Sequence, residues 1–332
     1  MTARRALGLA AAASALTLTA CGDSPSMTTP RSPEARTIAQ NWWLLFWLAF
    51  GVYIIVMGLV VAAMLRRRRL PEGERLRRVD NRFIVIGGLI VPVVILGITA
   101  VETVRVANKL APASASADAP VQIRVEGERW WWRVDYPDEG FATANEIHVP
   151  VDQPVDITLV SDNVIHSLWI PELNGKQDMI PGQVNHLRFT ADTPGTYLGR
   201  CAEFCGIQHA HMEFVVVVDS LEDYEAWLDT NRADAAPPAG DEARQGKEIV
   251  ETTSCAGCHS IRGTAADGDF GPDLTHVGSR TRLAAGAIDN TPDGMARWLD
   301  ETQHLKEGAL MPEIDLTDDQ VAALVAYLEG LR

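Results

Sequence analysis

Two long apolar stretches dominate the hydrophobic pattern near the N-terminus, WWLLFWLAFGVYIIVMGLVVAAML (42–65) and FIVIGGLIVPVVILGITAV (83–101). Each is close to the ~20 residues that a helix needs to cross a bilayer at ~1.5 Å per residue. The segment between them, RRRRLPEGERLRR, carries arginines that favour the cytoplasmic side of a membrane. Two buried core helices would not explain an uncharged first stretch that ends in arginines. We therefore predict a transmembrane helix hairpin over residues 42–104, with both of its ends facing outward.

The first residues, MTARRALGLAAAASALTLTAC, have the pattern of a secretory signal. Two arginines precede an apolar run that is too short to span a bilayer, and small residues precede Cys21. The ending LTAC resembles a bacterial lipobox, which implies cleavage before Cys21 and acylation of its thiol. An ordinary signal cleaved near Ala20 is the alternative. We predict a signal peptide, of the lipoprotein type, over residues 1–21 and an exported N-terminal segment over residues 22–41.

After the linker APASASADAP, the pattern changes to short strands separated by turn sequences such as TPGT and IPGQ. This regular spacing predicts a small antiparallel β-sandwich that ends near Ser220, within a domain over residues 105–220. The strand candidates are VQIRVEG, NEIHVPV, VDITLVSD, NHLRFTAD, GTYLGR and EFVVVVD. The stretch DTNRADAAPPAGDEA is rich in Ala, Pro and Asp and predicts a flexible linker within residues 221–242. A separate small domain follows over residues 243–332.

Composition narrows the function only a little. The 332 residues are 47% hydrophobic and 22% charged, which argues for folded domains rather than general disorder. A formal net charge of -15 argues against a nucleic-acid-binding surface.

The cysteines carry more information, because everything after about residue 105 is predicted to lie outside the cytoplasm. Of the five, Cys21 belongs to the signal and the others form two close pairs. The first pair lies in CAEFCGIQHAHM (201–212) together with His209 and Met212. A disulfide is the simplest alternative but leaves the histidine and the methionine unexplained. Zinc has little use for a thioether, and a blue-copper site takes one cysteine. Two thiolates can bridge two metal ions.

A second histidine must come from another part of the sandwich. His166 in SDNVIHSLWIPEL is the best candidate because it closes a strand and opens a loop. His148 and His186 lie within strand patterns, where histidines more often belong to the surface or the core. The spacing of His211 from Cys205 is wrong by two for a ligand, so we interpret it as a loop neighbour.

At this point a family resemblance becomes clear. The sequences VIHSLWIPEL, DMIPGQVN and CAEFCGIQHAHM, preceded by the hairpin and by GERWWWRVDY, resemble subunit II of the haem-copper cytochrome c oxidases over about residues 38–220. The resemblance implies an all-β cupredoxin domain with a binuclear copper centre, CuA. It implies that Cys201 and Cys205 bridge the coppers, that His166 and His209 are terminal ligands, and that Met212 and the Glu203 carbonyl are weak axial ligands.

The same resemblance implies two further roles. The carboxylate of Glu203 would bind a magnesium ion at the border with subunit I. Trp130, in the run WWW, would be the exposed tryptophan at which electrons enter, although core packing accounts for most single tryptophans. Asp178 matches an acidic position near the face where the donor docks, and a solvated surface carboxylate is the alternative there.

The second cysteine pair lies in SCAGCHS (254–260), the signature of covalent haem c attachment. Cys255 and Cys258 would add to the haem vinyl groups and His259 would bind the iron, whereas a thioredoxin-like disulfide lacks its βαβ context here. We predict Met311 as the second axial ligand, because it lies in a loop held extended by the following proline. Met295 falls in a helix pattern that favours a core position. His276 and His304 are outside candidates.

Together, these features predict a multidomain electron-transfer subunit: a transmembrane hairpin, a cupredoxin sandwich and an all-α cytochrome c domain. The fused form resembles the caa3-type oxidases. That resemblance implies a bacterial cell-membrane protein, with both termini and the soluble domains outside, that passes electrons from cytochrome c or another respiratory donor through haem c and CuA to subunit I. Oxygen reduction and proton pumping would occur in that partner, which would assemble with this chain and other oxidase subunits.

Two other functions remain open on the sequence. A nitric oxide reductase also uses a CuA subunit with a hairpin, and only the partner subunit distinguishes it. A Sco-like copper-delivery protein uses Cys-x-x-x-Cys and a distant histidine, but it predicts one membrane anchor and a thioredoxin-like alternation of strands and helices. A quinol oxidase subunit is excluded if the copper ligands are real.

Overall fold

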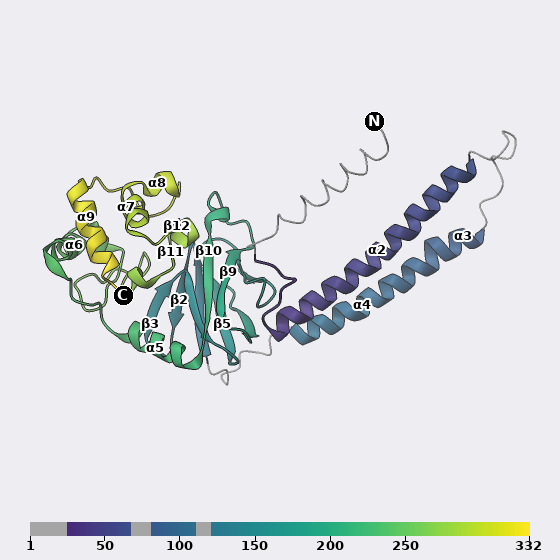
Figure 1. Ribbon diagram of the computed structural model, residues 1–332, viewed down its shortest axis with the longest axis horizontal. Coiled ribbons are helices and arrows are strands. Elements are labelled where there is room, and N and C mark those ends of the chain that lie inside the picture. The colour runs from purple at the N-terminus through teal and green to yellow at the C-terminus, as the bar shows by residue number, and fades with distance from the viewer. Residues whose placement is uncertain (1–24, 68–80, 111–120) are drawn as a thin grey trace, which may run out of the picture.

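The computed structural model describes residues 25–67, 81–110 and 121–332, which form a pair of long helices, a β-sandwich and a helical domain in that order (Figure 1). The fold class predicted from the sequence is therefore confirmed. The predicted signal peptide with Cys21, most of the arginine-rich segment and the linker 111–120 lie outside the described residues.

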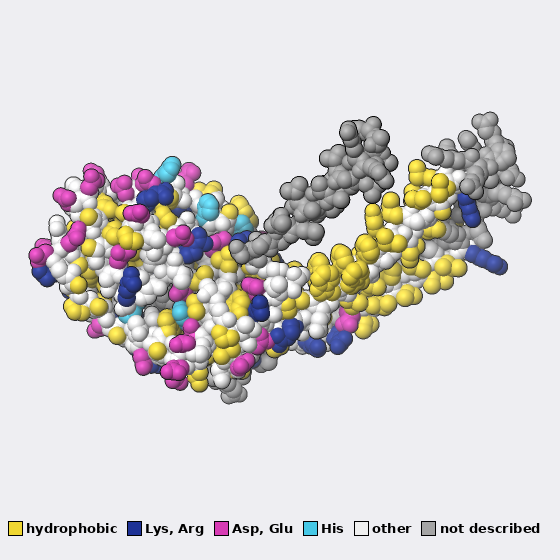
Figure 2. Space-filling model, in the orientation of Figure 1, with side chains coloured by type: hydrophobic (Ala, Val, Ile, Leu, Met, Phe, Trp, Pro, Cys, Tyr) yellow, Lys and Arg dark blue, Asp and Glu magenta, His cyan; other side chains and the backbone are white. Residues whose placement is uncertain are grey.

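The helix pair projects from one end of the sandwich. The first helix is α2 (Pro33–Arg67), and the second runs through α3 (Asn81–Val85), a π-helical turn η1 (Ile86–Ile90) and α4 (Val91–Leu110). Two segments, Pro33–Arg66 and Ile86–Leu110, are long and apolar enough to cross a membrane. Hydrophobic side chains cover the visible surface of both helices (Figure 2). Because an apolar surface of this extent is unfavourable in water, it indicates a lipid environment.

The first turn of α2 is attached to the sandwich. The Ser32 hydroxyl donates to the Leu173 carbonyl and accepts from the Ala35 amide (2.9 Å), so it caps the helix and anchors it at once. Arg36 forms an ion pair with Asp192. The helix therefore begins within the predicted exported segment 22–41, and its first turn fixes the hairpin against the sandwich.

The sandwich consists of two five-stranded sheets. The first has the order β3-β2-β1-β5-β8 and the second β4-β10-β9-β6-β7. The strands are β1 (Val121–Glu128), β2 (Trp131–Tyr136), β3 (Phe141–Ala144), β4 (Glu146–Pro150), β5 (Pro154–Ser161), β6 (His166–Trp169), β7 (Gln177–Met179), β8 (Asn185–Thr190), β9 (Gly195–Cys201) and β10 (Glu213–Asp219). The prediction of a purely antiparallel sandwich is wrong, because β1 pairs with β5 and β4 with β10 in parallel. Strand periodicity does not encode the direction of pairing.

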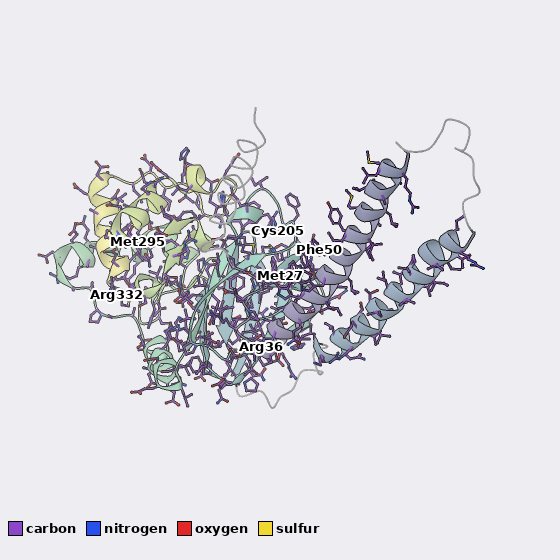
Figure 3. All side chains as sticks on the ribbon, turned by 45° about the vertical axis from the view of Figure 1, so that its right-hand side comes forward. Met27, Arg36, Phe50, Cys205, Met295 and Arg332 are labelled. Carbon is purple, nitrogen blue, oxygen red and sulfur yellow. The ribbon has the colours of Figure 1, made fainter. Side chains whose placement is uncertain are left out.

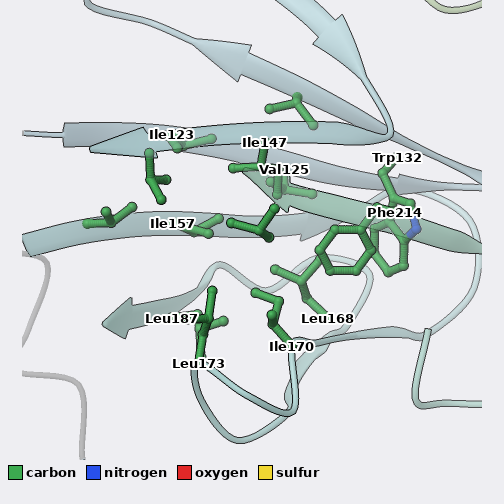
Figure 4. Close-up of a cluster of buried hydrophobic side chains, with 14 of the residues drawn as sticks. Ile123, Val125, Trp132, Ile147, Ile157, Leu168, Ile170, Leu173, Leu187 and Phe214 are labelled. Atoms are coloured by element: carbon green, nitrogen blue, oxygen red, sulfur yellow. The ribbon is translucent and has the colours of Figure 1, made fainter. Parts of the chain in front are cut away.

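Alternating residues of both sheets fill the space between them (Figure 4). Ile123 and Val125 of β1 face this core, as do Ile147 of β4 and Ile157 of β5, and all are at most 1% exposed. At one end of the core, Trp132 packs edge-on against Phe214 and also lies against the ring of His166. This end of the core thus supports the first histidine of the predicted copper site.

The segment after the sandwich is more ordered than predicted. Residues 221–232 form α5 (Leu221–Arg232), which begins at a Ser220 cap and buries Tyr224 and Leu228 against the sandwich. Only residues 233–239 lack a helix or strand before the next helix. The first part of the predicted linker is helical because it buries one apolar face against the sandwich. The Ala, Pro and Asp content of the stretch had suggested a flexible segment throughout.

The helical domain contains a core of its own. Its elements are α6 (Gly240–Thr252), η3 (Ser254–Gly257), η4 (Val277–Ser279), β11 (Arg282–Leu283), η5 (Ala284–Gly286), β12 (Ile288–Asp289), α7 (Pro292–Asp300), α8 (Thr302–Leu305) and α9 (Asp318–Glu329). The terminal helix α9 starts at a capping box in which Thr317 and Gln320 exchange hydrogen bonds. Helices α6 and α9 cross at Gly246, where a Cβ would collide with the Ala323 carbonyl and would lie 2.7 Å from the Tyr327 Cβ.

Replacing Gly246 by alanine should therefore destabilise the helical domain by ~1–3 kcal/mol, because the collision is with backbone that cannot rotate away. Hydrogen–deuterium exchange of the α9 amides in the full-length protein should accelerate. The matched control is Gly257→Ala, since nothing lies within 4 Å of a Cβ at that position. Unchanged α9 exchange in Gly246→Ala would contradict the tight helix crossing.

Candidate functional site

The loop 201–212 is held at both ends by the second sheet. Cys201 is the last residue of β9, and Met212 directly precedes β10. The Cys201 amide donates to the Met212 carbonyl (3.0 Å), which closes the loop at its base. The Ala202 amide donates to the Ser167 carbonyl (2.9 Å), which ties the loop to β6. The antiparallel β9–β10 hairpin thus brings residues eleven positions apart into contact.

Sulfur and nitrogen atoms converge inside this loop. The Cys201 and Cys205 sulfurs lie 3.7 Å apart and are free thiols. The Nδ1 of His166 lies 3.9 Å from the Cys201 sulfur, and the Nδ1 of His209 lies 3.6 Å from the Cys205 sulfur. Among the described residues, His166, Cys201 and Cys205 are the group that could hold a metal ion. The arrangement is a pair of sulfurs flanked by one imidazole on each side.

Two weaker donors complete the cluster. The Met212 sulfur lies 3.8 Å from the Cys205 sulfur, and the Glu203 carbonyl oxygen lies 3.2 Å from the Cys201 sulfur. Both cysteines and Met212 are buried. Thiolates, imidazoles and a thioether form a donor set that suits copper better than zinc, magnesium or calcium. The residues present therefore fit a copper centre.

Burial and hydrogen bonding prepare the donor atoms for a metal. The hydrogen bond between the two sulfurs lowers the pKa of Cys201 and raises the pKa of Cys205. The fully buried His166 donates its Nε2–H to the Asn163 side-chain oxygen (2.9 Å), which leaves Nδ1 free to face the sulfurs. Asn163 itself donates to Glu128 (3.0 Å). No motif in the sequence marks Asn163 as part of the site, although it lies only three positions before the histidine.

The structure places His166 differently from the sequence prediction, and it places His211 as predicted. His166 begins strand β6 rather than closing a strand, because the turn 162–165 precedes it and β6 pairs with β7 and β9. His211 points elsewhere than the sulfur cluster, as its Nδ1 hydrogen-bonds the Gln208 side-chain oxygen (2.8 Å). The loop geometry thus agrees with the interpretation of His211 as a loop neighbour.

The acidic candidates lie at the edge of the site. The Glu203 carboxylate is exposed and lies 3.8 Å from the Lys176 ammonium, while its backbone carbonyl faces the cluster. Asp178 of β7 accepts a hydrogen bond from the Ser167 hydroxyl (2.8 Å). The carboxylate of Glu203 therefore lies outside the sulfur cluster, beside Lys176.

The helical domain contains a large cavity beside the sandwich. From its own side, the cavity is lined by Cys255, Cys258, His259, Met295 and Met311. Figure 3 places Met295 in the helical domain and Cys205 in the neighbouring sandwich. Two thiols, one imidazole and two thioethers around one apolar cavity form a donor set that fits a covalently attached haem.

The imidazole of His259 is oriented for a metal. Its Nδ1–H donates to the Pro272 carbonyl (2.7 Å), and burial lowers the pKa of His259, which keeps the ring neutral. Gly271 lies against the ring, where a Cβ would be 2.7 Å from the Cε1 atom. The backbone therefore forms a close cradle that only glycine permits.

Both candidate methionines reach the cavity. Met295 is buried in α7, as its helix pattern predicts, whereas Met311 lies in an irregular loop and is partly exposed. The side-chain amide of Gln303 donates to the Met311 carbonyl (2.7 Å) and to the Ala309 carbonyl (2.8 Å), which fixes that loop. The selection of Met311 as the ligand stays a prediction.

The cavity is also lined by the sandwich, through Glu128, Arg129, Trp130 and Trp131. The expectation that Trp130 is exposed is wrong, since only 8% of its surface is accessible. The helical domain covers it: Lys306 donates to the Trp130 carbonyl (2.8 Å), and a Cβ added at Gly308 would lie 3.6 Å from the indole ring. The Trp130 Nε1–H donates to the Cys205 carbonyl (2.9 Å). This one indole therefore links the wall of the cavity to the sulfur loop.

Comparison with known proteins identifies both domains. Residues 140–220 match the family described as cytochrome C oxidase subunit II, periplasmic domain, and residues 243–332 match cytochrome c. The chain is 33% identical over 325 residues to cytochrome c oxidase subunit 2 of Alkalihalophilus pseudofirmus, covering 96% of this chain and 94% of that protein. It is 30% identical to the subunit 2 of Bacillus subtilis over 83% of each chain. Among solved structures, the periplasmic domain of subunit II of cytochrome oxidase of Bradyrhizobium japonicum is 30% identical, with 35% of this chain and 95% of that chain covered at a TM-score of 0.33.

The packing of Gly127 against His166 gives a test of the sulfur cluster. A Cβ on Gly127 would lie 2.8 Å from the imidazole Cδ2, so Gly127→Ala should displace the ring. We expect copper affinity to fall about tenfold, as for other disturbed supports of metal ligands. Competition with a chelator of known affinity measures this change. Gly175→Ala is the control, because its nearest neighbour is the flexible Ile38 side chain at 3.4 Å. Equal affinity in both variants would contradict the proposed placement of His166.

Proposed function

The chain belongs to the cytochrome c oxidase subunit 2 family, and we propose that it passes electrons from an external donor, through a covalent haem c and a binuclear CuA centre, to subunit I. Its combination of domains is that of a caa3-type subunit II, which makes the chain a subunit of a haem-copper oxidase. The first domain implies that the chain binds copper, and the second implies that it binds haem. The carrying observation is the single indole, Trp130, that lines the haem cavity and hydrogen-bonds the copper loop.

In this proposal, six residues hold the coppers: His166, Cys201, Glu203 through its carbonyl, Cys205, His209 and Met212. Cys201 and Cys205 would hold the metals through their thiolates, and the separation of 3.7 Å between the two sulfurs supports this role. When bound, two coppers held in this way would supply a one-electron site in which the charge is shared and the geometry changes little. The β9–β10 hairpin and Asn163 contribute rigidity, which keeps the donors in place in both redox states.

In the haem domain, Cys255 and Cys258 hold the haem covalently and His259 binds its iron. Met311 would bind the iron as well, in a loop that Gln303 fixes. Covalently held haem with a methionine ligand supplies a one-electron carrier of raised potential.

The remaining roles concern the partner subunits and the membrane. Glu203 offers its exposed carboxylate to a magnesium ion at the border with subunit I. All eight histidines of the chain follow residue 147, so the hairpin supplies no imidazole for an oxygen-reducing site. Oxygen reduction and proton pumping therefore take place in subunit I. The helices anchor the chain with its soluble domains on the outer face of the bacterial membrane, and cytochrome c or another respiratory protein supplies the electrons.

Copper analysis of histidine variants tests this function. Elemental analysis of the purified chain should find a pair of coppers, and His209→Ala should lose copper because it removes a terminal ligand. His211→Ala is the matched control and should retain copper, since its ring contacts Gln208 and not the sulfurs. Zinc or a single copper in the unaltered chain would exclude the CuA assignment.

The haem ligand can be tested in the same way. Met311→Leu should lower the reduction potential of the haem and change its optical spectrum, because loss of a methionine ligand removes the stabilisation of the reduced iron. Met295→Leu should leave the spectrum unchanged, as leucine can fill the same core space. If only Met295→Leu alters the spectrum, the ligand is Met295.

A further inference from the structure

Lys306 occupies a position that the proposed function does not use. It follows α8, is 2% exposed, and lies between the haem domain and the sandwich. Its ammonium donates to three backbone carbonyls, those of Ala284 (2.6 Å), His211 (2.7 Å) and Trp130 (2.8 Å). The first acceptor belongs to the haem domain and the other two belong to the sandwich.

The chemistry of these contacts is specific to lysine. An ammonium group has three N–H donors and no acceptor, and here each donor has its own carbonyl. Burial lowers the pKa of Lys306 to about 7, whereas the three acceptors favour the protonated form. Removing the side chain would leave three buried carbonyls without this partner, which is more costly than losing an exposed ion pair.

The two sandwich acceptors lie next to the sulfur cluster. His211 lies in the copper loop between the predicted ligands His209 and Met212. Trp130 is held from both sides, since its indole N–H donates to the Cys205 carbonyl (2.9 Å) and its own carbonyl accepts from Lys306. A single ammonium therefore fixes the haem domain to the indole and to the copper loop together.

Other contacts support the same interface. The Gln208 side-chain amide donates to the Glu307 carbonyl (2.9 Å), directly beside Lys306. Farther away, Thr281 donates through its amide (3.1 Å) and its hydroxyl (2.8 Å) to the Glu146 carboxylate. The Thr281 pair shares no atom with the Lys306 contacts, so it reports on docking independently.

We propose that Lys306 is a positioning residue that keeps the haem domain docked on the copper loop with Trp130 between the two cofactor sites. This inference rests on the proposed electron-transfer function. One electron crosses the docked interface from the haem site to the copper site, and no bond or proton needs to move. Docking makes this transfer independent of a search by a tethered domain.

Amide exchange tests the docking without any activity measurement. In the full-length, cofactor-loaded chain, Lys306→Met should accelerate deuterium exchange at the Thr281 amide by about tenfold or more, because the whole interface opens more often. The control, Lys247→Met, removes a partly exposed lysine of the same domain that pairs with Glu251 and should change nothing. Exchange that is faster only at residues next to position 306 would overturn the proposal.

The rate of haem-to-copper electron transfer gives the second measurement. It should fall in Lys306→Met while the haem and copper spectra stay as in the unaltered chain. An unchanged rate together with unchanged Thr281 exchange would overturn the positioning role. If Lys306→Met loses its cofactors, Thr281 exchange and the electron-transfer rate are measured in Lys306→Gln instead. Glutamine keeps a polar group but cannot donate to three carbonyls, so the same two changes are expected. A lack of haem-to-copper transfer in the unaltered chain would instead contradict the proposed function.

Discussion

The antiparallel pairing of β9 with β10 is the constraint on which the rest of the site depends. It joins the Cys201 amide to the Met212 carbonyl (3.0 Å) and so forces the intervening chain into one compact loop. Because the loop is closed, both sulfurs, His209 and the methionine face a common space. A flexible loop with the same residues would have to lose conformational entropy each time it bound a metal.

The haem domain extends this rigidity beyond the sandwich. Residues 233–239 connect the two domains without helix or strand. The interface nevertheless contains the buried Lys306, which donates to carbonyls of both domains, and the Glu146 carboxylate of the sandwich, which accepts from Thr281 of the helical domain. Buried polar groups of this kind stabilise one relative orientation, because each alternative leaves some of them unpaired. The cavity for the haem is consequently a shared cavity, with Trp130 as part of its wall.

The sequence predicts local chemistry well and tertiary contacts poorly. The apolar stretches, the CAEFCGIQHAHM run and the SCAGCHS run are local patterns, so the fold class could be predicted from them. The close approach of Gly127 to His166 and the three acceptors of Lys306 depend on residues that are far apart in the chain. The contact of Asn163 with His166 is local, but it depends on the conformation of the turn between them. The error about Trp130 has the same origin. The expectation of an exposed indole came from the sandwich alone, whereas in this chain the helical domain covers that indole.

We propose that electrons pass between the two sites within a preformed interface rather than after a search by the tethered domain. The rate of internal electron transfer from haem to copper in the purified chain, measured at increasing solvent viscosity, tests it most directly. A docked interface predicts a rate that does not change as viscosity rises. A rate that falls in proportion to viscosity would show that the haem domain must move first, and would contradict the account.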